Sequence, residues 1–188
     1  LSKSNCKLAA LTVHADGSFD AQVHDSKNKY DLFLHGEVLA ADATGRAADP
    51  ASWLACGNGA DADKVQCTST AAGQDDVSIQ SDNGILLAQM VFGTRTTEVN
   101  IDVGLSYLSA QHARGNLRSS AAYQGGARSS FSQALGSVQS DWCAQLEYLQ
   151  VDTGTDAALE RSLLAASYRT RLTPAVYSEH DGTYRGFD

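Results

Sequence analysis

The stretch Val99-Asn100-Ile101-Asp102-Val103-Gly104-Leu105-Ser106-Tyr107 decides the fold class, because apolar residues occupy every second position of it. In an extended strand these apolar side chains share one face, while Asn100, Asp102 and Ser106 take the other. That pattern is typical of a half-buried strand in an antiparallel sheet. We therefore expect residues 99–107 to form a strand of a β-sandwich.

The same period of two continues toward the N-terminus. Alternating runs flank Ala15-Asp16-Gly17-Ser18, and an Asp-Gly pair in that position predicts a β-hairpin. Residues 30–39 and 77–79 have the composition of further strands. Residues 84–92 precede the stretch described above closely enough that we expect the two to pair.

Residues 40–76 are rich in Ala, Gly, Asp and Ser, which predicts a long loop insertion with room for a short helix at 50–54. Cys56 and Cys67 stand on either side of a Gly- and Asp-rich segment within it. A disulfide between them would order such a segment, so we favour this pair in a secreted or luminal protein.

Two further cysteines, Cys6 and Cys143, are either paired with each other or free, and Cys143 in mid-helix is open to a buried-thiol interpretation. A zinc site is disfavoured because no Cys-x-x-Cys or His-x-x-x-His spacing occurs. The net charge of −8 and the absence of a basic cluster argue against a nucleic-acid partner. No apolar run is long enough to span a membrane.

The period changes to that of a helix in the last third of the chain. Apolar residues recur there at steps of three and four: Phe131, Leu135, Val138, Trp142, Leu146 and Leu149. Ser129 or Ser130 can cap this helix, and the stop at Gly154 separates it from a second helix that ends before Pro174. Two helices joined by a short loop form an αα-hairpin.

Strands followed by helices indicate segregated layers or separate domains. We expect a β-sandwich portion at residues 1–114, including the 40–76 insertion, then a connector at 115–127 and helices at 128–188. The fold class expected is an α+β multi-domain fragment.

Three segments of the second half carry a family resemblance. They are Val103-Gly104-Leu105-Ser106-Tyr107-Leu108-Ser109-Ala110-Gln111-His112-Ala113-Arg114-Gly115-Asn116-Leu117, then Trp142 with Leu146 and Val151, and then Ser167-Tyr168-Arg169-Thr170-Arg171-Leu172-Thr173-Pro174 followed by Tyr177-Ser178-Glu179-His180-Asp181-Gly182-Thr183-Tyr184-Arg185-Gly186-Phe187-Asp188. In order and spacing they resemble the glycoside hydrolases of family 92, the exo-acting α-mannosidases. Glu179-His180 depart from the pattern, since the family usually has Asp and a small apolar residue there.

The resemblance implies an N-terminal antiparallel β-sandwich packed against an (α/α)₆ barrel that begins with the αα-hairpin. It also implies a chemistry, the calcium-dependent, inverting hydrolysis of terminal α-linked mannose in glycans. The catalytic acid and base and most calcium ligands of the family lie in later barrel segments. We therefore expect the rest of the same protein, or a completing chain, to supply them. The alternative is a non-catalytic, mannosidase-like module that binds glycans or serves an extracellular assembly.

Within the third segment, Asp188, Arg185 and Asp181 are the candidate substrate-binding residues, because carboxylates and guanidinium groups hold sugar hydroxyls. The other interpretation is a loop between helices, in which Asp181-Gly182 is a turn and Arg185 pairs with Asp188. Glu179 and Asp181 are disfavoured as a catalytic pair, because side chains two apart in an extended segment point in opposite directions. No catalytic residue and no metal ligand is expected within this chain.

Overall fold

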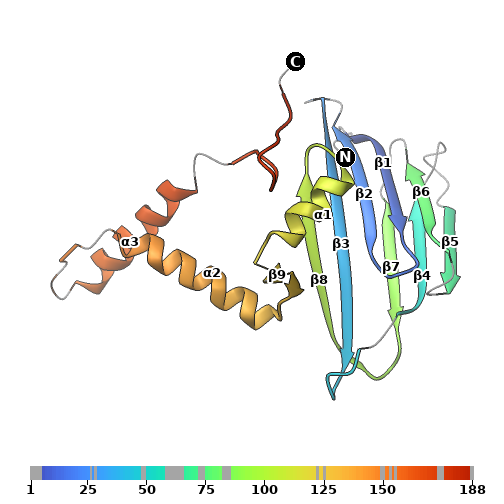
Figure 1. Ribbon diagram of the computed structural model, residues 1–188, viewed down its shortest axis with the longest axis horizontal. Coiled ribbons are helices and arrows are strands. Elements are labelled where there is room, and N and C mark those ends of the chain that lie inside the picture. Colours follow the sequence, from blue (N-terminus) through green and yellow to red (C-terminus); the bar gives the residue numbers. More distant parts are fainter. Residues whose placement is uncertain are drawn as a thin grey trace. The chain divides into compact units, whose positions relative to one another are not determined.

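The computed structural model describes residues 6–25, 27, 29–47, 50–57, 66–71, 75–81, 86–121, 123–124, 126–148, 151–152, 154, 156–172 and 176–186. The chain divides into two compact units. Unit 1 comprises residues 1–120 together with 179–188, and unit 2 comprises residues 121–178. Antiparallel sheets together with helices confirm the α+β class (Figure 1).

The larger sheet of unit 1 has five antiparallel strands in the order β6-β1-β2-β3-β8. Their bounds are β1 Cys6–Val13, β2 Phe19–Asp25, β3 Tyr30–Asp42, β6 Val77–Ser81 and β8 Thr96–Ser106. The predicted hairpin at residues 15–18 is confirmed as the turn between β1 and β2, where Gly17 takes φ +87°. Glycine reaches this left-handed conformation without the steric cost that other residues carry.

The second sheet has three strands in the order β5-β4-β7, with β4 at Pro50–Gly57, β5 at Gln66–Ala71 and β7 at Leu87–Phe92. The prediction of a loop insertion at 40–76 with a helix at 50–54 is therefore wrong, since β4 and β5 lie within that range. Cys56 and Cys67 face each other across β4 and β5 with their Cα atoms 4.1 Å apart, and they form the disulfide that the sequence favoured.

The expected pairing of residues 84–92 with residues 99–107 is also wrong, although both are strands. β7 pairs with β4 in the small sheet, whereas β8 pairs with β3 in the large sheet. The chain crosses between the sheets in a tight turn closed by a 3.0 Å hydrogen bond from the Thr96 amide to the Gly93 carbonyl. β7 and β8 are thus consecutive in sequence but belong to different sheets.

The two sheets pack through their inner faces. Leu11 and Val13 of β1 are 7% and 2% exposed and form the centre of the core. Partly buried apolar side chains of both sheets surround them: Phe19, Ala21, Ile79, Leu86, Ala88 and Met90. Beside this core, an apolar groove of about 670 Å³ remains open between the sheets, with Val99 and Ile101 of β8 among its lining residues.

The burial of β8 is the reverse of the expected one. Its apolar face is exposed, with Ile101 at 57% and Leu105 at 52%. Its other face is covered by helix α1 (Ala110–Arg118), which contacts β8 and β3 (Figure 1). Gly104 makes this packing possible, because a Cβ there would collide with the Ala113 carbonyl. The alternation predicted the two faces correctly but not which of them is covered.

Helix α1 also corrects the expected connector at 115–127, part of which is helical. Ser109 caps the helix by accepting a 3.2 Å hydrogen bond from the His112 amide. The short strands β9 (Tyr123–Gln124) and β10 (Ala127–Arg128) then form a hairpin in unit 2.

Unit 2 contains the predicted pair of helices, α2 (Phe131–Leu146) and α3 (Ala157–Arg171). Ser130 begins α2 with a capping box to Gln133, and Asp156 caps α3. The rings of Trp142 and Tyr168 lie 4.5 Å apart between their centroids. Neither helix has a buried residue. The Cys143 thiol is free and exposed, so its interpretation as a buried thiol is wrong.

Candidate functional site

The two parts of unit 1 that carry the family resemblance meet at one carboxylate. Glu179, only 6% exposed, accepts hydrogen bonds at Oε1 from the Ser106 hydroxyl at 2.7 Å and from the Tyr107 amide at 3.2 Å. Asn116 donates its side-chain amide to Oε2. Glu179 therefore anchors the terminal segment, residues 179–186, to the end of β8 and to α1.

The hydrogen bonds to Glu179 keep it ionised. Burial opposes its charge, but the donors from Ser106, Asn116 and the Tyr107 amide outweigh this cost and hold the pKa of Glu179 below its ordinary value. An ionised, saturated carboxylate cannot give a proton to a leaving group, so Glu179 is an anchor and not a general acid.

Asn116 organises the junction from the α1 side. Its amide nitrogen also donates to the Leu105 carbonyl at 2.6 Å, and its oxygen accepts from the His180 amide at 2.8 Å. The His180 ring covers Gly115, where a Cβ would collide with it. His180, which departs from the family pattern, thus packs on the helix with its side chain exposed.

Asp181 lies at the tip of a tight turn in the terminal segment. The Glu179 amide donates to the Thr183 carbonyl at 2.7 Å, and Gly182 adopts φ +83°. Thr183 donates its amide and its hydroxyl to Asp181 Oδ1 at 3.0 and 2.6 Å. These two donors hold the pKa of Asp181 below its ordinary value. The turn in the alternative interpretation is therefore present.

The second oxygen of Asp181 faces outward from this turn. Oδ2 lies 3.7 Å from Nε2 of His112, and the Asp181 side chain is 42% exposed. An ionised oxygen with one distant partner can accept a hydrogen bond from a sugar hydroxyl. Asp181 thus braces the turn through Oδ1 and leaves Oδ2 as a partly exposed acceptor.

Arg185 is fixed by the backbone of another loop. Its Nη2 donates to the Lys29 carbonyl at 2.9 Å, and the rest of its side chain is exposed. Tyr184 beside it is 68% exposed, which leaves an aromatic face open to solvent. Asp188, the third candidate, lies outside the described residues, and so does its expected pairing with Arg185.

Sequence reasoning missed the anchoring roles of Glu179 and Asn116. Both stand in segments singled out for the resemblance, but nothing in either segment indicates that the two touch across more than 60 residues of chain. A buried carboxylate can be found from sequence only when its donors are known, and here they come from a strand end and a helix.

Within the described residues, no group of three His, Cys, Asp or Glu side chains could hold a metal ion. We therefore assign no calcium ligand among the described residues and derive no chemical step through calcium. No described helix is long and apolar enough to cross a membrane.

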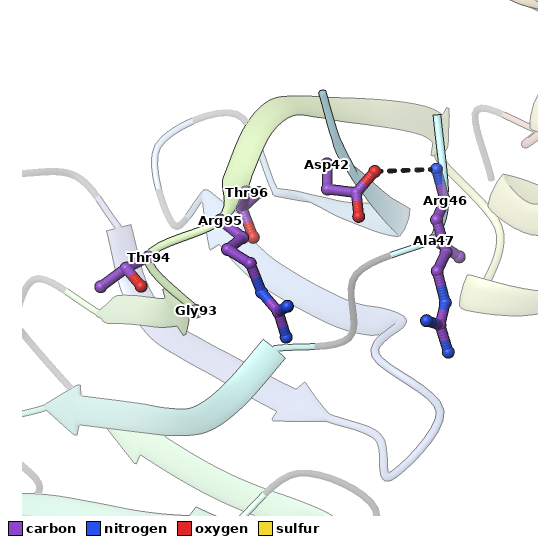
Figure 2. Close-up of a pocket in the computed structure, with 7 residues that line it drawn as sticks. All are labelled: Asp42, Arg46, Ala47, Gly93, Thr94, Arg95 and Thr96. Carbon is purple, nitrogen blue, oxygen red and sulfur yellow. Dashed lines mark hydrogen bonds between the residues drawn. The ribbon is translucent and has the colours of Figure 1, made fainter. Parts of the chain in front are cut away.

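A pocket of about 390 Å³ lies at the opposite end of β3 and β8. Figure 2 shows Arg46 and Arg95 on two turns, with the Asp42 carboxylate between them in the view. Asp42 accepts from the Thr44 hydroxyl at 2.6 Å and from the Arg46 amide at 3.1 Å, so it fixes the turn that carries Arg46. No lining residue is buried, and the carboxylate offsets one of the two positive charges. We assign this pocket no ligand.

No protein-family model matches the chain, and a search of curated proteins finds no match.

Proposed function

We propose that this chain is part of a secreted, α-mannosidase-like glycoside hydrolase that removes terminal α-linked mannose with inversion. In this proposal the terminal segment forms one rim of the sugar site. The helices α2 and α3 are the first of an (α/α)₆ barrel, in a domain separate from the sheets.

One observation carries the proposal. Two of the three segments that resemble the family, far apart in sequence, meet through the Glu179 anchor. A segment held only as a loop between helices has no need of a buried carboxylate with three donors. The anchor sets the position of Asp181 and Arg185, and preorganised groups bind sugar hydroxyls at lower entropic cost.

The residues of the rim bind and orient. Asp181 Oδ2 accepts a hydrogen bond from a sugar hydroxyl, Arg185 donates from its exposed guanidinium edge, and Tyr184 offers a ring to the C–H face of a sugar. Hydrolysis with inversion needs one carboxylic acid for the leaving oxygen and one carboxylate for water. Glu179 and Asp181 are both held ionised. Neither can therefore be the acid, and we place both the acid and the base in segments outside this chain, as the resemblance implies.

The second candidate function is a non-catalytic module that keeps the rim for glycan binding or for an extracellular assembly. The roles of Glu179 and Asp181 favour it as much as they favour the enzyme, because bracing and binding need no proton transfer. The Cys56–Cys67 disulfide supports an oxidising compartment in both cases.

Mannose release separates the two functions. The full-length protein is incubated with α-1,2-mannobiose, with and without a calcium chelator, and free mannose is measured. Release that the chelator abolishes supports the enzyme, and we then expect Asp188→Ala to raise KM or lower kcat. If the folded protein binds the disaccharide but releases no mannose, the non-catalytic, glycan-binding function is supported instead.

Binding tests the rim itself. We expect α-1,2-mannobiose to shift the NMR signals of Thr183 and Arg185 in the 188-residue chain, and Asp181→Asn or Arg185→Gln to weaken its binding at least about tenfold. Arg161→Gln, an exposed arginine of α3, is the matched control and should bind as the natural chain does. If the natural chain and all three variants bind the disaccharide with equal affinity, the rim is not part of a sugar site.

A further inference from the structure

The strand β8 forms one end of the larger sheet, beyond β3 (Figure 1). Within the described residues, no strand pairs with its outer edge. A sheet edge presents a row of backbone N–H and C=O groups, and a long, apolar edge is a template for adding a further strand. β8 has 11 residues, and its side chains at Val99, Ile101 and Val103 are 44%, 57% and 45% exposed. The proposed sugar site does not use this part of β8.

Two hydrogen bonds show which residues of β8 point their backbone groups away from β3. The Leu105 carbonyl accepts from the Asn116 side chain at 2.6 Å, and the Tyr107 amide donates to Glu179 at 3.2 Å. The N–H and C=O of one strand residue point to the same side, and the side alternates along the strand. The odd-numbered residues before Leu105 therefore also point their backbone groups outward: Val99, Ile101 and Val103.

One end of this outer edge is already occupied. Asn116 of α1 and Glu179 of the terminal segment bond to Leu105 and Tyr107, where the backbone of an added strand would otherwise bond. In the part of the chain that the structure describes, no group bonds to the outward N–H and C=O groups of residues 99–103. A strand that joins this edge must therefore pair with residues 99–103.

A second copy of β8 can satisfy these groups. Two antiparallel β8 strands related by a two-fold axis place the same edge against itself, which closes the assembly as a dimer. With Ile101 opposite Ile101 of the second copy, Val99 lies opposite Val103, and each pair exchanges both of its backbone hydrogen bonds. The apolar side chains of the two strands then adjoin on one face of a continuous sheet. An apolar small molecule would leave the same N–H and C=O groups without partners.

The charges on the other face of β8 favour this register. With Ile101 at the centre, Asn100 lies opposite Asp102 of the second copy, so an amide adjoins a carboxylate. A pair centred on Asp102 sets two carboxylates opposite each other, and a pair centred on Asn100 sets Glu98 opposite Asp102. Like charges directly opposite one another destabilise a sheet.

The occupied end of the edge disfavours a register centred on Val103. That register places Ile101 opposite Leu105 of the second copy, whose carbonyl already accepts from Asn116. We propose that the outer edge of β8 binds a second copy of this chain, with the two strands antiparallel and centred on Ile101. This dimer goes beyond the proposed sugar site and does not depend on it, because it is measured without a sugar.

Sedimentation velocity and amide exchange test the dimer together. Pairing over a few residues makes a small interface, so we expect the 188-residue chain to be monomeric at about 1 μM and mainly dimeric at about 500 μM. Exchange of the Val99, Ile101 and Val103 amides should slow at least about tenfold in the dimer. The Asn100 and Asp102 amides, which face β3, should be protected at both concentrations.

A charge swap tests the register. Asn100→Asp sets two carboxylates opposite each other at two symmetric places in the dimer and should weaken it about tenfold. Asn100→Asp combined with Asp102→Asn again sets an amide opposite a carboxylate, so the double variant should dimerise as the natural chain does. Asp102→Asn alone is the matched control, because it introduces no pair of like charges.

A proline tests whether the backbone makes the contact. Val103→Pro removes an outward amide that β3 does not use, and proline is tolerated on the free edge of a sheet. This variant should stay monomeric at the highest concentration. Val103→Thr keeps the amide and the shape of the side chain, so it should dimerise. The charge swap serves as the test if the proline prevents folding.

Three results would overturn the proposal. They are a natural chain that stays monomeric at about 500 μM, a dimer that Asn100→Asp or Val103→Pro leaves unchanged, and protection of the Val99, Ile101 and Val103 amides in the monomer. The last result would mean that a segment of the same chain covers this edge.

Discussion

Units 1 and 2 differ in how well the apolar pattern of the sequence predicts which side chains are buried. The helices of unit 2 follow a regular apolar period, yet neither α2 nor α3 contains a buried residue. In unit 1, by contrast, β1 buries Leu11 and Val13 between the two sheets. A period states which side chains share a face, whereas burial depends on a second surface that covers it.

The two units should therefore draw their stability from different sources. Unit 1 depends on packing between layers and on a cross-strand disulfide. Unit 2 depends on local interactions, namely the caps at Ser130 and Asp156 and the contact of Trp142 with Tyr168. Each unit contains one tryptophan, Trp53 in unit 1 and Trp142 in unit 2, so single-tryptophan variants can follow their unfolding separately.

The largest expected effect is that of the disulfide. Cys67→Ser frees a loop between two cysteines 11 positions apart and should lower the free energy of unfolding of unit 1 by about 3 kcal/mol. Cys143→Ser removes a free, exposed thiol of unit 2 and should change the stability of either unit by less than about 0.5 kcal/mol. Urea unfolding of both variants, followed through each tryptophan, checks this contrast, and equal losses would contradict it.

A matched pair of leucines tests the contrast in burial. Leu11→Ala should cost unit 1 about 2–3 kcal/mol, toward the lower end for core leucines because the site borders an open groove. Leu135 of α2 is 44% exposed, so Leu135→Ala should cost unit 2 less than about 1 kcal/mol. A loss at Leu135 as large as at Leu11 would mean that the face of α2 is covered.

Replacing each of two glycines by alanine should change the free energy of unfolding in opposite directions. Gly104→Ala forces a Cβ against the carbonyl of Ala113 and should destabilise unit 1 by about 2 kcal/mol. Gly136 of α2 has open space around it, so Gly136→Ala should stabilise that helix by about 0.5–1 kcal/mol. The shifts in denaturation midpoint give both values, and two changes of the same sign would argue against packing as their cause.

The smallest effect concerns the anchor of the terminal segment. Glu179→Gln removes the charge that three donors share and should weaken docking by about 1–2 kcal/mol, seen as faster exchange of the His180 amide. The pKa of Glu179 is lowered by docking, so its contribution is full above 4.5 and is lost as the pH falls through the lower, docked value.

The acid-dependent loss should therefore disappear in Glu179→Gln. It should persist in Asp181→Asn, because the Asp181 carboxylate of the natural chain is exposed and bonds mainly to Thr183 within its own turn. An acid transition that is unchanged in Glu179→Gln would assign it to another group.

The sequence predicted the features that depend on local chemistry. The Asp-Gly hairpin, the Ser130 cap and the two helices are all set by residues within a few positions of one another. The Cys56–Cys67 pair was also predictable, because its two cysteines are close in the chain.

Features that depend on distant partners were not predictable. β4 and β5 consist largely of small residues, and their strand conformation comes from pairing with each other and with β7. Helix α1 covers one face of β8 and leaves the apolar face exposed. The alternation of apolar residues in β8 cannot predict where α1 packs. In the candidate site, the sequence indicated Asp181 and Arg185 but not the anchor that positions them.

The pairing of β3 with β8 has a kinetic consequence. The ladders that join β1, β2 and β3 pair residues that are close in the chain, such as Phe19 with Gly36. We therefore expect these ladders to form early in folding. The register of β3 with β8 joins Phe33 to Ser106, so a long loop must close before that ladder forms. Ser106 is also a donor to Glu179, so the terminal segment cannot dock fully until β8 has joined the larger sheet. Docking of the terminal segment would then report the fraction of molecules in which β8 has already joined the sheet.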